Sequence, residues 1–235
     1  MNHRRTRTLV ISICLLLPFG CSSSQGLHPE PLAELLRYEE QRFIGEQPPK
    51  PITTNPSGRN LPKLGLYLKP AGFHKWEFDW TDSDRGTVLA WANGLHASGI
   101  VSSASFVTQS SVRGNSLAEL RGSAARYGAD LLLIIDGAAS IDRYNNYKAS
   151  QLYWTILGVY LVDGTHSDAL CLLRGSVWDV KTGTQLFTDD AQATARQIGP
   201  VARVQDRATV SEACRLALTQ LLTTLKNRLT QPQNP

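Results

Sequence analysis

The densest group of side chains that could do chemistry lies in the segment Asp163–Asp168, which reads Asp-Gly-Thr-His-Ser-Asp. Its carboxylates, imidazole and hydroxyls could bind calcium or form the catalytic cluster of a hydrolase. A calcium loop of the EF-hand type, however, needs further oxygen ligands and a distal Glu, and a nucleophile needs a base that a third group orients. Neither pattern is complete. We therefore predict a polar turn between two strands, and a hydrolase that uses Asp163, His166 and Asp168 is the alternative.

Two further acids, Asp130 and Asp136, flank an apolar stretch in which a raised pKa could mark a general acid. We instead expect Asp130 to accept local backbone hydrogen bonds where a strand starts, and Asp136 to lie where the apolar run ends. The sequence contains no Gly-rich phosphate loop, nucleophile elbow or Cys-x-x-Cys, and its histidines are scattered. We predict that the protein is not an enzyme and has no catalytic residues, metal or cofactor.

The N-terminal segment has the plan of a signal peptide. Arg4, Arg5 and Arg7 precede the apolar residues 9–17, and a small residue, Gly20, follows shortly after. The apolar run, about nine residues, is too short to span a bilayer as a mature helix. We predict that residues 1–20 are removed after export.

Cys21 directly after Gly20 matches the bacterial lipobox. A thiol at this position takes a diacylglyceryl group as a thioether, and the new N-terminus then takes a further acyl chain such as palmitate. Three chains anchor a protein firmly, whereas one myristoyl chain binds only marginally. Pro18 stands where lipoboxes usually carry Leu and Phe19 is bulkier than usual, so cleavage elsewhere by an ordinary signal peptidase is the alternative.

The residue after the cysteine indicates where the anchor is sorted. By resemblance to Gram-negative lipoproteins, Ser22 is not the Asp that retains such proteins at the inner membrane. We therefore predict a lipoprotein anchored at the periplasmic face of the outer membrane.

The charge balance argues against nucleic acid as a partner. The chain has 24 Lys and Arg against 20 Asp and Glu, and three of those arginines leave with the signal peptide. The mature protein is therefore close to neutral and has no basic cluster, whereas a nucleic-acid-binding domain needs a basic stripe.

Cys171 and Cys214 are the thiols that remain when Cys14 leaves with the signal and Cys21 carries lipid. In an oxidising periplasm they could pair as a disulfide. Both lie in apolar-patterned segments, where small buried cysteines are common, so two buried free thiols are the alternative.

Hydrophobic periodicity and turn residues predict the elements of the chain. The first part contains a short helix over 31–43, a Pro-rich linker, a strand over 63–69, a helix from Thr81 or Ser83 to about residue 99, a strand over 100–107, a helix over 116–127 and a strand over 129–141. The second part contains three long strands over 150–162, 169–180 and 185–195, and a closing helix over 205–229.

This order predicts an α/β (α+β) fold with one mixed sheet, a long antiparallel meander and about three packed helices. We expect a signal peptide over 1–20, then an anchor site, short helix and Pro-rich tether over 21–60. A soluble α/β domain over 61–229 and a disordered tail over 230–235 complete the expected organisation.

Three segments together carry a family resemblance: Tyr127–Asp130 (Tyr-Gly-Ala-Asp) before an apolar strand, Trp154–Tyr160 in the next strand, and Val177–Phe187 across a hairpin. Over about residues 61–225 the chain resembles the rhombotarget lipoprotein family. More distantly it resembles the periplasmic domains of curli-secretion (CsgG-like) lipoproteins and the N-terminal domain of TolB. The resemblance implies no known enzyme activity.

Two departures limit what the resemblance implies. The chain ends in Thr230–Pro235 without the Gly-Gly, transmembrane and basic sorting tail of some rhombotarget proteins, so processing by a rhomboid-type protease is not carried over. A CsgG-like secretion or pore component would need transmembrane hairpins with alternating lipid-facing residues, and Asp142, Arg143 and Arg174 interrupt such a band.

Two aromatic groups are candidate partner surfaces. Trp76, Phe78 and Trp80 lie close together before a helix, and exposed aromatic residues typically anchor interfaces. Their alternative role is packing onto the core. Tyr144 and Tyr147, at the far end of a long strand, form the second candidate. We expect a non-enzymatic envelope lipoprotein that binds a protein or envelope component, and a periplasmic hydrolase or a CsgG-like component is the alternative.

Overall fold

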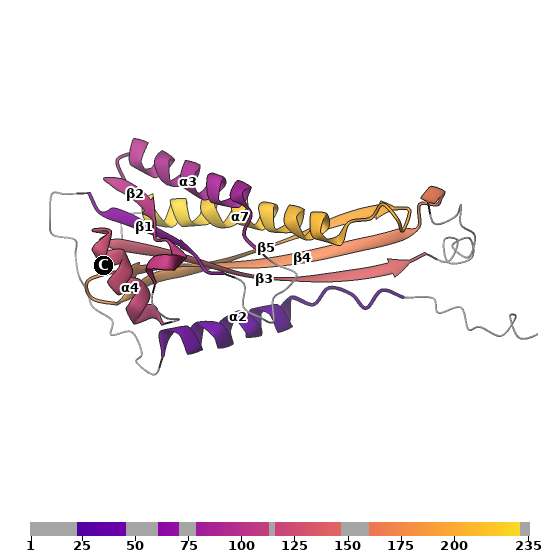
Figure 1. Ribbon diagram of the computed structural model, residues 1–235, viewed down its shortest axis with the longest axis horizontal. Coiled ribbons are helices and arrows are strands. Elements are labelled where there is room, and N and C mark those ends of the chain that lie inside the picture. The colour runs from indigo at the N-terminus through magenta and orange to yellow at the C-terminus, as the bar shows by residue number, and fades with distance from the viewer. Residues whose placement is uncertain (1–22, 46–60, 71–78, 113–115, 147–159, 231–235) are drawn as a thin grey trace, which may run out of the picture.

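The computed structural model describes residues 23–45, 61–70, 79–112, 116–146 and 160–230. They form one five-stranded sheet with helices on both faces (Figure 1). The elements are α2 (Pro29–Ile44), β1 (Lys63–Leu68), α3 (Asp82–Ala97), β2 (Ser103–Phe106), a 3-10 turn (Gln109–Ser111), α4 (Leu117–Arg126), β3 (Leu131–Asn145), β4 (Thr165–Asp179), β5 (Gln185–Gly199) and α7 (Asp206–Thr230).

The strand order is β2-β1-β3-β4-β5. β1 pairs in parallel with both β2 and β3, whereas β3, β4 and β5 form an antiparallel meander. Each meander strand has 15 residues and continues well beyond the end of β1, so one end of the sheet is a three-stranded ribbon (Figure 1). This mixed sheet with a long meander confirms the predicted fold class.

One face of the sheet packs against α3 and α7 (Figure 1). Leu64, Leu66 and Leu68 of β1 point to this face, as their alternation predicts, while Tyr67 points to the other. The predicted apolar stripe of the last helix is buried throughout, and it comprises Val210, Ala213, Cys214, Ala217, Leu218, Leu221, Leu222 and Leu225. α7 crosses β4 closely at Gly175, where an added Cβ would lie 3.0 Å from Leu225 Cδ1.

The opposite face carries two helices. α4 covers Tyr67, Leu132, Ile134 and Trp178, and α2 covers Ala138, Leu170 and Leu172 through its own Leu32 and Leu36. The prediction that the folded domain starts at residue 61 therefore places the boundary too late. The charged residues of α2 masked a two-leucine contact stripe that is sufficient to join the helix to the sheet.

A predicted capping residue and a predicted turn residue are found where a helix begins and where a hairpin turns. Thr81, one of two predicted caps, accepts a hydrogen bond from the Asp84 backbone, and Asp84 binds the Thr81 backbone in return. Gly183 adopts φ 76° in the hairpin between β4 and β5, as predicted.

Two predictions about the meander are wrong. Residues 150–159 of the expected strand 150–162 lie outside the described residues, but Tyr160 and Leu161 are helical and β4 pairs directly with β3. β4 already begins at Thr165, so four residues of the expected 163–168 turn belong to a strand. Their polarity is compatible with the sheet because Thr165, Ser167 and Asp168 gain hydrogen-bond partners and the His166 ring stacks on Tyr144.

Candidate functional site

The end of the three-stranded ribbon carries a polar and aromatic surface on the face that α2 covers elsewhere. The strand register aligns side chains there in two rows across β3, β4 and β5. The inner row is Asp142, Asp168 and Arg196, and the outer row is Tyr144, His166 and Ile198. We call these six residues the distal face.

The segment that leads into α2 binds the distal face at Asp142. In Figure 1 this segment runs from α2 along β3 toward the end of the sheet. Ser24 Oγ donates to Asp142 Oδ2, and the Gly26 backbone N–H donates to the same oxygen at 2.9 Å. Asp142 itself is only 8% exposed. The carboxylate therefore fixes the chain three residues after Cys21 to the sheet.

The environment of Asp142 favours its charged form. Burial raises the pKa of Asp142, but hydrogen bonds from Ser24 and from the backbone of Gly26 and Gln25 outweigh that effect. The pKa therefore lies below its ordinary value of 3.8. The contact between the N-terminal segment and β3 is charge-assisted at neutral pH.

Arg196 holds the second carboxylate of the inner row. Its guanidinium donates from Nε and from a terminal nitrogen to the two oxygens of Asp168, both at 2.7 Å. Tyr144 also donates to Asp168 Oδ2, at 3.3 Å, and burial followed by the charge of Asp168 raises the pKa of Tyr144. Because the Arg196 side chain is 60% exposed, this pair orders the surface without adding much stability.

His166 stacks on Tyr144 and stays apart from Asp168. The two ring centroids are 4.8 Å apart with an interplanar angle of 9°, and His166 Nδ1 is buried with no hydrogen-bond partner among the described residues. Ser167 points to the opposite face, where its Oγ donates to Asp206 at 2.9 Å. Among the described residues, the expected hydrolase set thus lacks a base that a carboxylate orients toward a hydroxyl.

The structure places the predicted partner-surface residues in different environments. Trp80 is 7% exposed, and its Nε1 donates to the Lys69 carbonyl at 2.8 Å. It belongs to the core, which is the packing role that the sequence analysis also gave for this aromatic group. Tyr144 lies on the distal face, while Trp76, Phe78 and Tyr147 fall outside the described residues, as do Cys21 and Ser22.

Apolar side chains surround the end of the ribbon. Tyr160 is 55% exposed, Leu161 69% and Ile198 53%. They lie where β3 passes to β4 and where β5 passes to α7. Single exposed apolar residues are common on protein surfaces, and these three share one end of the sheet. The sequence did not indicate Leu161 or Ile198, because their neighbourhood depends on the strand register.

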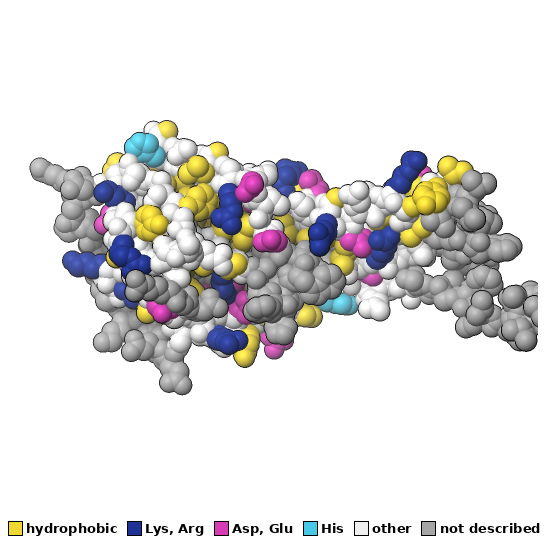
Figure 2. All heavy atoms as spheres, in the orientation of Figure 1, with side chains coloured by type: hydrophobic (Ala, Val, Ile, Leu, Met, Phe, Trp, Pro, Cys, Tyr) yellow, Lys and Arg dark blue, Asp and Glu magenta, His cyan; other side chains and the backbone are white. Residues whose placement is uncertain are grey.

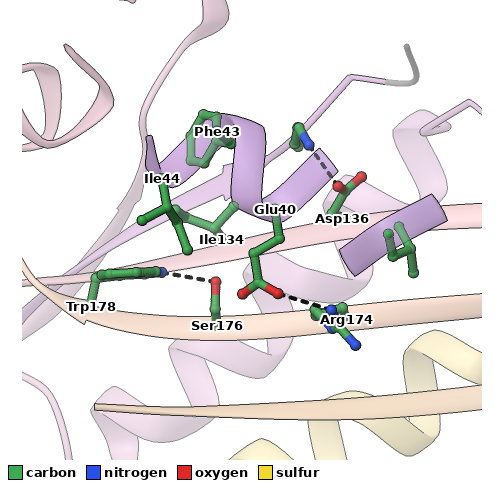
Figure 3. Close-up of a pocket in the computed structure, with 10 residues that line it drawn as sticks. Glu40, Phe43, Ile44, Ile134, Asp136, Arg174, Ser176 and Trp178 are labelled. Carbon is green, nitrogen blue, oxygen red and sulfur yellow. Dashed lines mark hydrogen bonds and ion pairs between the residues drawn. The ribbon is translucent and has the colours of Figure 1, made fainter. Parts of the chain in front are cut away.

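A charged network that the sequence analysis missed joins α2 to the sheet (Figure 3). Arg174 binds Glu40 at 2.9 Å and Asp190 at 2.7 Å, and Lys69 binds Asp136 at 2.8 Å and Glu39 at 3.2 Å. The space between them is about 20 Å³, enough for one water molecule. The network is therefore a structural contact, and the signal for it was an acid inside the apolar strand β3.

The charges in this network stabilise one another. Burial lowers the pKa of Lys69, but the charges and hydrogen bonds of Asp136 and Glu39 outweigh it, so the pKa lies above its ordinary value. Hydrogen bonds to Asp190, with the nearby charge of Glu40, raise the pKa of Arg174. Asp136, considered above as a general acid, is thus a salt-bridge partner of Lys69.

An open groove lies beside β5, between this strand and the first turns of α2. Its volume is about 340 Å³. The groove is lined by Pro29, Glu30, Ala33, Leu172, Asp190, Ala191 and Gln192. β5 is the last strand of the sheet, so its outer edge carries backbone groups that no described strand pairs.

On the other face, Cys171 of β4 and Cys214 of α7 form a disulfide with their Cα atoms 5.0 Å apart. Of the two alternatives for these thiols, the structure contains the bonded one. In the described part of the chain, no group of three or more His, Cys, Asp or Glu is placed to hold a metal ion. No helix among the described residues is long and apolar enough to cross a membrane.

No family model and no curated protein sequence matches the chain. Solved structures with a similar fold include the PelC dodecamer from Paraburkholderia phytofirmans, at 16% identity, covering 77% of this chain and 96% of that one, with a TM-score of 0.33. Lipoprotein GNA1162 from Neisseria meningitidis is 12% identical over 72% of this chain and 97% of that one, with a TM-score of 0.29. A minor lipoprotein from Acinetobacter baumannii is 13% identical over 72% of this chain and 96% of that one, with a TM-score of 0.33.

Two of these three structures are described as bacterial lipoproteins. TM-scores this low carry no argument about function. The resemblance to the rhombotarget family stays an expectation, and the function is argued from the residues of this chain.

Proposed function

We propose that this chain is a lipoprotein of the outer membrane, anchored at its periplasmic face through Cys21, whose domain binds another protein or envelope component without catalysis. The observation that carries the proposal is the continuity between the lipobox and the fold. Cys21 follows a signal-peptide pattern, and Ser24, three residues later, is bonded to Asp142 of the sheet. An anchor placed so close to a folded body suits a protein that works at the membrane.

The open edge of β5 supports the binding part of the proposal. Proteins usually blunt long edge strands with Lys, Pro or a covering element, because unpaired N–H and C=O groups recruit other strands. β5 contains neither Lys nor Pro, and its edge borders the groove along α2. A partner strand could pair with the β5 backbone while its side chains enter the groove, which is the β-augmentation mode of recognition.

The anchor is tested by Cys21→Ser, with Cys14→Ser as a matched control inside the signal peptide. We expect the Cys21→Ser protein to leave the membrane fraction after a salt wash and to incorporate no labelled palmitate. The Cys14→Ser protein should stay membrane-bound and labelled. A Cys21→Ser protein that remains with membranes after the wash contradicts the lipid anchor.

Sorting is tested by Ser22→Asp. We expect this variant to move from the outer- to the inner-membrane fraction on a density gradient, because Asp after the lipidated cysteine is the retention residue in Gram-negative lipoproteins. Ser23→Asp is the control and should leave the distribution unchanged. Identical distributions for wild type and Ser22→Asp would refute outer-membrane sorting by this residue.

The binding surface is tested by a photo-crosslinking residue at Gln192 on the groove, with the exposed helical position Asn93 as control. We expect a discrete crosslinked product in cells from Gln192 alone, identified by mass spectrometry. Products of equal yield from both positions, or none from Gln192, contradict a specific surface at β5.

A further inference from the structure

We propose that the end of the β3–β5 ribbon lies on the membrane surface, with Ile198, Tyr160 and Leu161 in contact with lipid and the sheet directed away from the bilayer. This inference rests on the proposed lipid anchor at Cys21. It adds an orientation and a contact surface that an anchor alone does not require, because a flexible tether would leave the domain free to rotate.

The first support is the short reach of the anchor. An extended chain spans at most about 3.6 Å per residue, so the Cα of Cys21 lies within roughly 11 Å of the Cα of Ser24. Ser24 and Gly26 are hydrogen-bonded to Asp142, three residues before the end of β3. A 15-residue strand is about 50 Å long. The lipid can therefore reach only this end of the sheet.

The second support is the composition of the same end. Tyr160, Leu161 and Ile198 account for three of the large apolar side chains exposed on the described surface, which also include Tyr38, Leu61, Leu89, Tyr127 and Leu186. Tyrosine with an apolar ring and a polar hydroxyl is suited to the membrane interface. Figure 2 shows hydrophobic and basic side chains side by side at the end of the molecule far from α3 and α4.

The third support is charge. Arg203 and Arg207 flank the start of α7 at this end, are exposed, and form no ion pair with a described residue. Arg143 and Arg196 lie nearby but are paired with Asp206 and Asp168. Unpaired arginines beside exposed apolar groups favour an anionic lipid surface. Asp163 and Asp142 equal these two arginines in number, but Asp142 is buried, so the charges exposed to a bilayer are the two arginines and Asp163.

The lipid and the surface patch act together. A patch of three apolar side chains and two arginines binds a bilayer only weakly by itself. The covalent lipid keeps the patch at a high effective concentration near the bilayer, so a weak contact is enough to set the orientation. The inference therefore predicts orientation in the anchored protein and little vesicle binding by the Cys21→Ser protein.

The test places a single fluorophore on β5. Ile198→Cys and Leu186→Cys introduce a labelling site near opposite ends of the same strand, at positions 53% and 36% exposed and about 40 Å apart. The introduced thiol is the only reactive one, because Cys171 and Cys214 are bonded and Cys21 carries lipid. The labelled lipidated protein is reconstituted into vesicles of phosphatidylethanolamine and phosphatidylglycerol that contain a nitroxide-labelled lipid.

We expect the label at position 198 to be quenched several-fold more than the label at 186. Equal quenching in a protein that floats with the vesicles overturns the orientation and leaves the anchor intact. A lipidated protein that does not float overturns the anchor, and the orientation with it.

A second variant tests the docking contact. Asp142→Ala removes the acceptor for Ser24 and Gly26, and Asp163→Ala removes an acid at the same end that binds neither. We expect quenching at position 198 to fall several-fold in Asp142→Ala and to be retained in Asp163→Ala, with both proteins still floating. Ser24→Ala should give a smaller loss, and it covers the case in which Asp142→Ala does not fold. Unchanged quenching in Asp142→Ala and Ser24→Ala overturns the role of the docked segment.

Discussion

Loss of the disulfide between Cys171 and Cys214 should strongly destabilise the domain. The bond joins β4 to α7 across the main core, and the two cysteines are 0% and 5% exposed. The perturbation is the double variant Cys171→Ala/Cys214→Ala, made in the mature domain without its lipid so that unfolding is followed in solution.

The expected magnitude follows from the loop that the bond closes. The cysteines are separated by 43 residues, and the chain-entropy model then gives a loss of about 4 kcal/mol in the free energy of unfolding. Because both sites are buried, alanine also leaves a small void that adds to this loss. Under reducing conditions, the free energy of unfolding of the wild-type protein should fall by a similar amount once the disulfide has been reduced to two thiols.

The assay is urea denaturation followed by tryptophan fluorescence and far-ultraviolet circular dichroism. With an m-value of about 2 kcal/mol/M, a loss of 4 kcal/mol lowers the midpoint by about 2 M. The m-value should rise as well, because the unfolded chain without the crosslink exposes more surface. Reductant should shift the midpoint of the wild type and leave that of the double variant unchanged.

Single variants provide the control on this reasoning. Cys171→Ala and Cys214→Ala each break the same bond, so each alone should cost nearly as much as the double variant. Additive single losses would show two independent thiols. A total loss below about 1 kcal/mol would refute the assignment of the crosslink as the main stabilising contact between β4 and α7.

Three further outcomes follow from the contacts. The NMR resonance of the Gly26 amide should report the titration of Asp142. Since the pKa of Asp142 is depressed in the folded protein, the contact holds at neutral pH and is lost only as the pH falls below 3.8. A titration midpoint above pH 3.8 would contradict the contact between Gly26 and Asp142. Lys69→Met should lower the free energy of unfolding by about 3 kcal/mol by removing the Lys69 ammonium from its ion pair with the buried Asp136 carboxylate, whereas the same change at exposed Lys226 should cost less than about 0.5 kcal/mol. Gly175→Ala should cost about 1–3 kcal/mol in thermal or urea unfolding because its Cβ would meet a leucine of α7 at 3.0 Å, and an unchanged midpoint would show that α7 can shift.

Much of the fold could be predicted because its signals are local. The alternation of Leu64, Leu66 and Leu68 determines which side chains of β1 share a face, and the stripe of α7 repeats at helical spacing from Val210 to Leu225. The cap at Thr81 and the positive φ of Gly183 depend on neighbours in sequence. Such features need no knowledge of the tertiary structure.

The predictions from sequence failed where contacts between residues far apart in the chain determine the structure. Asp168 has low strand propensity, and it joins β4 because Arg196 pairs with it from the neighbouring strand. Thr165, which we expected in the same turn, extends the strand and donates to Asn145 of β3. The predicted strand over 129–141 already contained Asp136, but its ion pair with Lys69, 67 residues away, could not be deduced from the sequence. Propensity was overridden by pairs that lie 20 or more residues apart.

The candidate site was the least predictable part. Tyr144 was identified as a candidate surface residue, but its contact with His166 and its place in one row with Ile198 depend on the register of three strands. Shifting a strand by one residue exchanges its two faces, so the distal face cannot be deduced from the spacing of single residues. Trp80 illustrates a second difficulty. The sequence shows an aromatic cluster but does not show which of its side chains are buried.

The packing of α2 changes what the residues between the anchor and β1 do. The sequence predicted one tether over 21–60, but α2 is held to the sheet by Leu32, Leu36 and the ion pairs of Lys69 and Arg174. If Cys21 carries the proposed lipid, only the few residues after it link the lipid to the folded body, and residues 46–60 connect α2 to β1 in the chain. A site for a sequence-specific protease inserted between Asn55 and Pro56 distinguishes the two cases. With α2 packed, the cleaved domain should stay with membranes in buffer and leave only in urea, because α2 remains bound through its buried leucines and salt bridges. Release in buffer immediately after cleavage would show that 21–60 acts as a simple tether and that α2 contributes little to holding the domain at the membrane.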